Sequence, residues 1–338
     1  MMPESGAAAV RAYAPGRVNL IGDHTDYTGG WALPMAIDRG TTVELVPGGS
    51  TVELVSADDP EPASVSLDLS AWPAGWARYV AGVVAVLRPP MGGRGSVTTT
   101  LPIGAGLSSS AALEVALALA LGFDGSPLEL ALATQRAELL AWGTPTGMMD
   151  QLASAAGVAG HALLVDCSSQ EVTPVPLPAG VEVVVVDSGQ RRSVATSAYG
   201  QRRRQCEAAA DLVGPLRSAT LDDVAAVADP LLRRRIRHVV SENGRVLALV
   251  DALRSGDLAR AGRLMTASHA SLRDDFEVST PVLDALVSDL TATPGVLGAR
   301  LTGAGFGGCV VALVAPGTPV PGWRVSAADG ARLLDPAG

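Results

Sequence analysis

The feature of this sequence that most restricts its fold is a block in which a strand ends in a glycine-rich turn and an apolar helix follows at once. Residues 96–101 have a strand-like pattern, residues 102–107 contain two glycines, and three serines open the Ala- and Leu-rich segment 108–121. The free N–H groups and positive dipole of a helix N-terminus bind phosphate, and glycine lets the backbone approach it closely. Three serines exceed what helix capping needs, which favours a phosphate site over an ordinary capped helix.

Phosphate handling is restricted further by the absence of lysine, because all 25 basic residues are Arg. Such a chain has no Walker A lysine, no strand lysine of the protein-kinase type and no Schiff base. Arg, backbone N–H groups, hydroxyls and a metal ion must then handle any phosphate.

Length, charge and cysteine content narrow the class of protein. The 338 residues are enough for two domains, and 48% hydrophobic with 17% charged residues predicts a well-packed globular enzyme. The net charge of −9 is expected to repel nucleic acid and anionic membranes. Three scattered cysteines, no signal-peptide pattern and no apolar run of membrane-spanning length predict a soluble, cytoplasmic protein.

The proline-rich stretch 174–178 is the best candidate for a domain boundary, dividing the chain into residues 1–176 and 177–338. Both parts alternate strand and helix patterns, which predicts two α+β domains. Strands are predicted at 41–46, 51–55, 96–101, 161–165, 181–186, 296–301 and 309–314. Helices are predicted at 75–87, 108–121, 128–142, from 148 onward, between 195 and 253, and at 257–271 and 280–290.

A second block crowds polar side chains beside an apolar strand, with Arg17, Asp23, His24 and Asp26 falling within ten residues. Carboxylates and an imidazole at this density suit recognition of a polyhydroxylated ligand, because each can bond one or two hydroxyls. Two alternatives stay open at this point. The segment could be a solvated turn with Asx-type hydrogen bonds, or His24 and Asp26 could hold a metal, although no second ligand cluster accompanies them.

Two further blocks place a charged residue or a glycine-rich turn among apolar residues. Asp150 lies between methionines and a leucine, where burying its carboxylate is costly unless it is paired, and Arg17 is a plausible partner. The alternative is a helix N-terminal Asp that faces solvent. Residues 303–308 have the spacing G-x-G-x-x-G, but a strand at 309–314 follows where a dinucleotide-binding unit needs a helix. We therefore expect a glycine-lined loop that approaches a substrate or phosphate.

Taken in this order, the blocks resemble the motifs of the GHMP kinases and, within them, of the galactokinases. The three family motifs are matched by Gly16–Tyr27, Pro102–Ala112 and Gly303–Gly308. Shorter matches occur at 149–151, 197–207 and 269–278, so the resemblance runs from about residue 14 to residue 314. It implies the two-domain α+β architecture of GHMP kinases, with the active site in the cleft between the domains.

The resemblance also implies roles for individual residues. Arg17 and Asp150 would flank the anomeric hydroxyl of a sugar, with Asp150 as general base or as an electrostatic partner. The remaining hydroxyls would be bound by Asp23, His24, Asp26, Gly147 and Tyr199. ATP would be bound by Trp76, packed on adenine, and around its phosphates by Gly104, Gly106, Leu107, Ser108, Ser109 and Ser110. Mg²⁺ would be held by Ser110 and Glu138.

The implied reaction is phosphorylation of the anomeric (C1) hydroxyl of galactose by ATP with Mg²⁺, giving galactose 1-phosphate and ADP, by a chain expected to be a monomer. The family usually has Glu where this chain has Asp23, which leaves open a related sugar such as N-acetylgalactosamine, fucose or arabinose. A sensor that binds sugar and ATP without turnover is a further alternative, and the intact serines and Asp150 argue against it. The chain after Val314 is short for the family, so the packing of its C-terminal part stays open.

Overall fold

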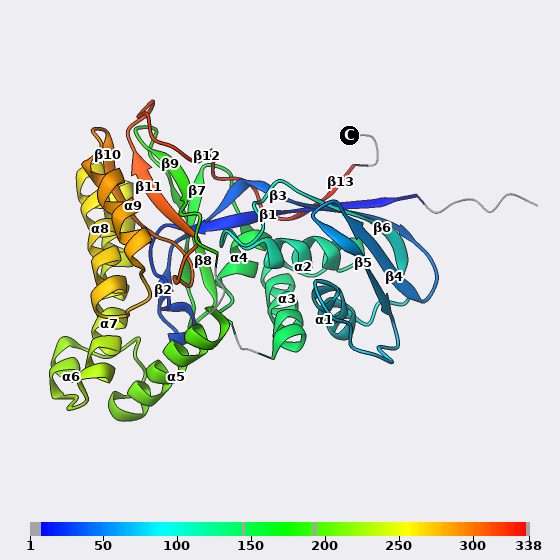
Figure 1. Cartoon of the computed structure of the whole chain (residues 1–338), viewed down its shortest axis with the longest axis horizontal. Coiled ribbons are helices and arrows are strands. Elements are labelled where there is room, and N and C mark those ends of the chain that lie inside the picture. The colour runs from blue at the N-terminus through cyan, green and yellow to red at the C-terminus, as the bar shows by residue number, and fades with distance from the viewer. Residues whose placement is uncertain (1–7, 144–145, 192–194, 336–338) are drawn as a thin grey trace, which may run out of the picture.

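The structure is a computed structural model that describes residues 8–143, 146–191 and 195–335. Its first sheet has the strand order β13–β1–β3–β6–β4–β5 (Figure 1). These strands are β1 (Val10–Asn19), β3 (Pro34–Pro47), β4 (Thr51–Ser56), β5 (Asp59–Ser66), β6 (Gly93–Thr99) and β13 (Arg332–Leu334). The pairing of β1 with β3 shifts register between Pro15 and Arg17, and a bulge of this kind turns the following side chain in a new direction.

One face of the first sheet is covered by helices, as Figure 1 shows. These are α1 (Ala77–Leu87), α2 (Ser109–Ala120), α3 (Pro127–Trp142) and α4 (Met149–Ala156). Helix α2 packs on β1 and β3 and also contacts the other three helices, and its residues 111–118 are all buried. A helix that is apolar on every side is typical of this position, and close packing on all sides fixes its N-terminal turn relative to β1.

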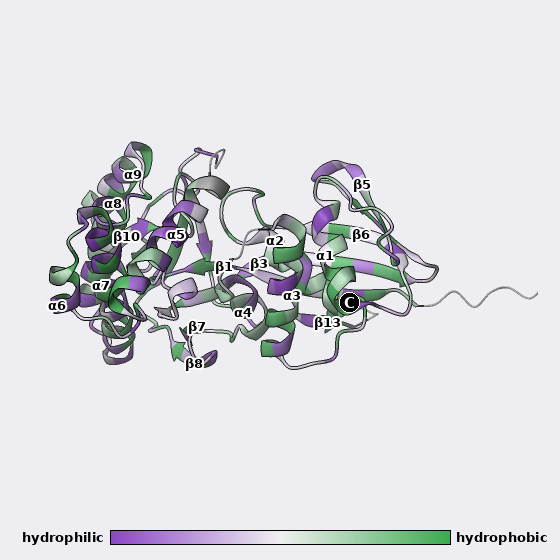
Figure 2. Cartoon of the chain, turned by 90° about the horizontal axis from the view of Figure 1, so that it is seen from below, coloured by the Kyte–Doolittle hydropathy of each residue, from purple (hydrophilic) through white to green (hydrophobic). Residues whose placement is uncertain are grey.

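A second sheet has the order β10–β11–β9–β12. Its strands are β9 (Glu182–Asp187), β10 (Val296–Leu301), β11 (Cys309–Val314) and β12 (Trp323–Val325). The helices of this half are α5 (Ala195–Val213), α6 (Leu221–Ala226), α7 (Pro230–Ser255), α8 (Leu258–Asp274) and α9 (Pro281–Ala292). Hydrophilic and hydrophobic residues are interleaved along α7, α8 and α9 (Figure 2), as expected for helices with one face in solvent.

A small sheet in the order β2–β7–β8 connects the two halves, because α7 contacts both β2 and β8 while β7 contacts β3. Its strands are β2 (Trp31–Ala32), β7 (His161–Asp166) and β8 (Glu171–Pro176). A single 3₁₀ turn, η1 (Asp26–Thr28), precedes β2. The polar segment 22–28 therefore lies at the junction of the two halves.

Most predicted elements are present within a few residues of their predicted bounds, and β10 and β11 coincide with them. The strands β5, β8, β12 and β13 are not predicted, because β5 and β8 contain two prolines each and the other two have three residues each. Strand β13 pairs with β1, so the chain returns to the first sheet near its end. The division into 1–176 and 177–338 stays a prediction. Within the described ranges, every helix is too short or too polar to cross a membrane.

Candidate active site

The glycine-serine turn that leads into α2 has positive φ angles, a backbone conformation that few residues other than glycine adopt. Gly104 and Gly106 have φ of 76° and 86°, a region in which an L side chain is strained. Ser108 stands at the N-cap with φ of 59° and its side chain makes no capping bond. The alternative of an ordinary serine-capped helix is therefore excluded for Ser108, whose hydroxyl donates to Asp150. The first turn of α2 is left without a serine cap, which suits an anion-binding helix end.

Arg17 and Asp150 form a two-pronged ion pair beside this turn. Nε of Arg17 donates to Oδ1 of Asp150 and Nη2 donates to Oδ2, both at 2.7 Å, a planar arrangement typical of strong Arg–carboxylate pairs. Arg17 Nη1 donates to the Gly106 carbonyl at 2.8 Å, and the Ser108 hydroxyl donates to Asp150 Oδ2 at 2.5 Å. The predicted pairing is confirmed, and Asp150 is not merely a solvent-facing residue at a helix start.

Close approach of the turn to β1 depends on Gly16. A Cβ at this position would lie 2.6 Å from the Leu107 carbonyl oxygen, which real Cβ atoms do not tolerate. That carbonyl accepts the Arg17 backbone N–H at 3.2 Å. Leu107 itself is 1% exposed and is not among the residues that line the second cavity described next, so its predicted contact with ATP stays a prediction.

Two cavities meet at the Arg17–Asp150 pair. One, of about 390 Å³, is lined by every residue predicted to bind the sugar, namely Asp23, His24, Asp26, Gly147 and Tyr199. The other, of about 590 Å³, is lined by Trp76 and by the turn at Gly104, Gly106, Ser108, Ser109 and Ser110. Arg17, Asp150, Glu138 and Tyr79 lie in the walls of both. Adjacent cavities that share one ion pair suit the transfer of a group between two bound ligands.

Several wall residues are not predicted from the sequence. They include Tyr79, Trp142 and Thr146 around the first cavity and Arg191 around the second, whereas Ile103 and Ala304 lie in the two glycine-rich blocks. Tyr79 follows Trp76 at the helical spacing i+3, a signal that could have placed both on one face. Arg191 follows β9 without any motif, and only the fold brings it to the site.

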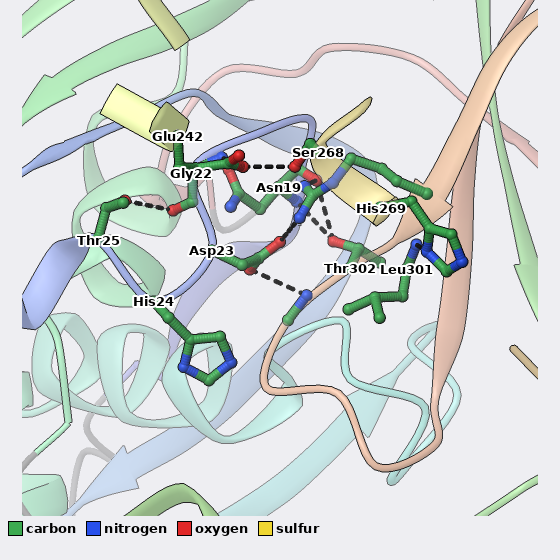
Figure 3. Close-up of polar contacts among 12 residues, drawn as sticks. Asn19, Gly22, Asp23, His24, Thr25, Glu242, Ser268, His269, Leu301 and Thr302 are labelled. Atoms are coloured by element: carbon green, nitrogen blue, oxygen red, sulfur yellow. Dashed lines mark hydrogen bonds and ion pairs between the residues drawn. The ribbon is translucent and has the colours of Figure 1, made fainter. Parts of the chain in front are cut away.

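The Asp23 carboxylate is held by the protein on both oxygens (Figure 3). Arg300 Nη2 donates to Oδ2 at 2.5 Å, and the Gly303 N–H donates to Oδ1 at 3.0 Å. The Arg300 side chain is 0% exposed and that of Asp23 is 3% exposed. Burial raises the pKa of Asp23, while Arg300 acts to lower it. Asp23 thus joins the polar segment to the glycine loop after β10, in addition to lining the cavity.

His24 and Asp26 face the same cavity, and burial shifts their pKa values in opposite directions. His24 has φ of 65°, its Nδ1 lies 3.0 Å from the Tyr27 hydroxyl, and its Nε2 lies 3.2 Å from the Ala304 carbonyl. Burial lowers the pKa of His24 to about 3, so its ring is neutral. Burial, and secondly the Asp150 charge, raises the pKa of Asp26 to about 7. Gly147 leaves room for Asp26, because a Cβ at Gly147 would collide with that carboxylate.

Side chains of helix α7, supported by Ser268 of α8, contact the backbone of the polar segment 22–28. Glu242 Oε1 accepts the Gly22 N–H at 3.1 Å and the Ser268 hydroxyl at 2.5 Å (Figure 3). His238 Nε2 lies 3.1 Å from the Asp23 carbonyl oxygen, so His238 also supports the backbone of this segment. Burial acts to raise the pKa of Glu242, but Arg245 and His238 lower it to about 2. The polar segment is therefore no solvated turn.

A divalent cation would fit between the two cavities, at Ser110 and Glu138. The Ser110 hydroxyl lies 3.3 Å from Glu138 Oε1. Glu138 Oε2 accepts from Thr146 Oγ1 at 2.8 Å and from Gln151 Nε2 at 2.9 Å, which leaves Oε1 directed toward Ser110. One carboxylate and one hydroxyl suit Mg²⁺, which takes one or two carboxylates together with substrate phosphates and water. In the part of the chain that the structure describes, no cluster of three or more His, Cys, Asp or Glu side chains is placed to hold a metal. Both ring nitrogens of His24 already have protein partners, Tyr27 and Ala304, which argues against the alternative metal site at His24 and Asp26.

Comparison with known families agrees with this geometry. Residues 4–47 match the model described as galactokinase galactose-binding signature. Residues 78–158 match the GHMP kinases N terminal domain, and residues 249–320 match GHMP kinases C terminal.

Individual relatives are also similar over most of their length. A galactokinase of Roseiflexus sp. (strain RS-1) is 46% identical over 323 residues, which cover 89% of this chain and 82% of that relative. The crystal structure of Lactococcus lactis galactokinase complexed with galactose has a TM-score of 0.90 and 31% identity, covering 96% of this chain and 95% of the other. Methanococcus jannaschii mevalonate kinase, at 19% identity and a TM-score of 0.70 over 97% of this chain and all of the other, shares the fold alone.

Proposed function

The chain belongs to the galactokinase family of GHMP kinases, and from this premise we infer that it phosphorylates galactose with ATP at the anomeric hydroxyl, giving galactose 1-phosphate and ADP. The observation that carries the site of transfer is the Arg17–Asp150 pair, which lies in the walls of both cavities. The smaller cavity takes the sugar and the larger one takes the nucleotide, so the acceptor hydroxyl and the γ-phosphate meet at this pair.

Asp150 acts on the acceptor hydroxyl, and Arg17 acts on the group that is transferred to it. A carboxylate oxygen of Asp150 accepts the hydrogen bond of the anomeric hydroxyl and orients its lone pair toward phosphorus, and it is also the group that can take the proton. Arg17 stabilises negative charge that develops on the transferred group, because its guanidinium is fixed by Asp150 and by the Gly106 carbonyl. Phosphoryl transfer needs positioning and charge neutralisation more than covalent help, so a chain without lysine can perform it.

The sugar's other hydroxyls would meet groups whose donor or acceptor character follows from their pKa shifts. Tyr199 acts as a donor, since burial and then the Asp26 charge raise the pKa of its phenol well above the usual value. Asp23 acts as an acceptor, Asp26 can donate or accept because its pKa is raised to about 7, and His24 is neutral. The Gly147 backbone leaves the space that the Asp26 carboxylate fills.

The nucleotide is held by the turn and by the wall opposite it. The first turn of α2, with Ser109, binds phosphate oxygens, and Trp76 packs on the adenine. The Trp76 indole N–H donates to the Glu61 carbonyl at 2.8 Å, which fixes the ring in the wall. Ser110 and Glu138 would hold Mg²⁺, which supplies charge neutralisation between the phosphates.

The test measures ADP release with MgATP over galactose, N-acetylgalactosamine, fucose, arabinose, glucose and homoserine. We expect galactose to give the highest kcat/KM, and R17M to lower it by about 10²–10³. The exposed Arg94, paired with Glu53 on the surface, gives a matched control in R94M, which should keep the wild-type rate. Preference for fucose or arabinose would contradict galactose as the substrate, and binding of sugar and ATP without turnover would contradict the kinase activity.

A further inference from the structure

Arg217 connects the loop between α5 and α6 to the small sheet beside the sugar cavity. Its Nη1 and Nη2 donate to the two carboxylate oxygens of Asp166, at the end of β7, and the distance from Nη2 to Oδ2 is 2.5 Å. Nη1 also donates to the Gly29 carbonyl at 2.8 Å. The guanidinium carbon lies 4.6 Å from the centre of the Trp31 ring, which is a cation–π contact. One side chain therefore binds a carboxylate, a backbone carbonyl and an aromatic ring together.

These contacts meet at one cross-strand pair of the small sheet. Trp31 of β2 is the antiparallel partner of Asp166 of β7, and the Cys167 N–H donates to the Gly30 carbonyl at 3.0 Å. The Asp166 side chain is 9% exposed and that of Arg217 is 29% exposed, so solvent screens the ion pair only in part. A two-pronged pair and a stacked ring each fix the plane of the guanidinium, so Arg217 holds this end of the polar segment in one orientation.

The segment that Arg217 binds is the turn that carries Asp26. The Gly30 N–H donates to the Thr25 carbonyl at 2.8 Å, and this bond closes the turn around η1. Asp26, at the start of η1, lines the sugar cavity, and Gly29, three residues later, is bound by Arg217. Because the turn is closed, a shift of the Gly29 carbonyl would also move the Asp26 carboxylate.

The backbone of Arg217 is fixed by the half of the molecule that contains the second sheet. The neighbouring Leu216 is 2% exposed and belongs to the hydrophobic core of that half. The Ser218 N–H donates to the Pro215 carbonyl at 3.0 Å, and Thr220 begins α6 with a capping box. The loop therefore gives Arg217 a fixed starting point from which to reach the turn.

Helix α5 contacts the same turn near its own N-terminus. Tyr199 of α5 lines the sugar cavity, and its ring centre lies 5.5 Å from that of Tyr27 and 5.7 Å from that of His24. The turn is thus contacted by Tyr199 near the start of α5 and by Arg217 shortly after its end. Arg217 is not among the described residues that line either cavity, so its effect on a bound sugar passes through the turn.

We propose that Arg217 is a positioning residue for the sugar. By holding the Gly29 carbonyl and the cross-strand pair of the small sheet, it sets the separation of Asp26 and Tyr199 across the sugar cavity. The inference rests on the proposed function in taking that cavity as the sugar site. None of these residues is among the described residues that line the nucleotide cavity, so the effect of losing Arg217 should be confined to the sugar.

Substitutions at Arg217 separate its bonding pattern from its charge. R217M removes every polar contact and keeps much of the side-chain volume, whereas R217K keeps a positive charge that cannot bind the carboxylate in two prongs. The readouts are galactose and MgADP binding to the full chain by calorimetry, and hydrogen exchange of residues 22–32. We expect R217M to raise the Kd for galactose about tenfold and to speed exchange in 22–32, with the Kd for MgADP unchanged. R217K should fall between R217M and wild type.

R324M is the matched control. Arg324 also binds one carboxylate, that of Glu182, and one carbonyl, that of Thr318, and it is not among the described residues that line either cavity. R324M should keep both affinities and the exchange pattern of residues 22–32.

A merely structural role would lower stability without separating the two ligands. Equal rises in the Kd for galactose and for MgADP in R217M, a wild-type Kd for galactose in R217M, or unchanged exchange in residues 22–32 would each overturn the proposal.

D166N tests the same contact if R217M does not fold. Asn keeps Oδ1, which also accepts the Ser168 N–H at 2.9 Å, and places an amide donor where Oδ2 accepts from Arg217. D166N should raise the Kd for galactose and leave that for MgADP unchanged, and a wild-type Kd for galactose would overturn the proposal.

Wild-type protein separates a failure of this inference from a failure of the proposed function. Binding of MgADP without any binding of galactose would overturn both. Galactose-dependent ADP release by wild type, together with unchanged galactose affinity in R217M, would overturn the role of Arg217 alone.

Discussion

The buried pair of Arg300 and Asp23 allows a stability effect to be worked out from the structure. Both side chains are at most 3% exposed, and Arg300 Nη2 donates to Asp23 Oδ2 at 2.5 Å. Replacing Arg300 by Met keeps most of the packing. The Asp23 carboxylate then stays buried, and of its two donors, Arg300 and the Gly303 N–H, it keeps the Gly303 N–H. Removing one partner of a buried ion pair costs about 3–5 kcal/mol, so R300M should lose that much free energy of unfolding.

The pH dependence of this loss follows from the same charge. Burial already raises the pKa of Asp23 and Arg300 acts against that rise, so the pKa must climb further in R300M. Protonation then removes the unpaired charge, and the loss relative to wild type should be smaller at pH 5 than at pH 8.

Urea unfolding of four proteins measures both effects, namely wild type, R300M, D23N and R300M/D23N. Each single variant leaves one buried charge unpaired, so the double variant should lose less than the sum of the singles. R94M, at an exposed pair, should lose at most about 1 kcal/mol. A loss below about 1 kcal/mol in R300M, or strict additivity with D23N, would refute the reasoning.

Three further predictions concern single wall residues. G147A forces a Cβ onto the Asp26 carboxylate and should raise KM for galactose roughly tenfold, since overpacking costs about 1–3 kcal/mol, whereas G48A, with open space around it, should leave steady-state kinetics unchanged. W76A removes the ring proposed to pack on adenine and should raise KM for ATP but not for galactose; equal rises in both would contradict its place in the nucleotide cavity. Asp26 keeps its proton to about pH 7 in the folded chain, against an ordinary 3.8, so stability should fall as pH rises from about 4 to 7. D26N should remove that part of the slope in urea unfolding, and an unchanged slope would contradict the assignment.

The parts of the site that the sequence predicts well are those where local pattern and chemistry agree. The Asp150 carboxylate lies among apolar residues, so it needs a positively charged partner. Arg17, 133 residues away in the sequence, is that partner. Helix α2 follows from its run of apolar residues, and its glycine turn from spacing. Trp76 and the serines reach the predicted cavity because they stand at the starts of α1 and α2.

The parts that sequence reasoning misses depend on long-range packing. Arg300 reaches Asp23 from a strand 277 residues away, and nothing in its neighbourhood signals a buried charge. Glu242 looks in the sequence like any acidic residue on a polar helix, although it accepts the Gly22 N–H. The contact of Ser108 with Asp150 is also missed, because local pattern does not show that this serine has a positive φ and donates to a residue 42 positions away.

The most direct test of phosphoryl transfer at the Arg17–Asp150 pair is the product and rate of the D150N enzyme. Single-turnover reactions with galactose and MgATP, followed by ³¹P NMR, identify the phosphorylated position and the rate together. Wild-type enzyme should give phosphate on the anomeric oxygen, and D150N should lower the rate by about 10²–10⁴ while galactose and ATP still bind. A D150N enzyme that keeps most of its rate, or a product phosphorylated elsewhere on the sugar, would contradict the account.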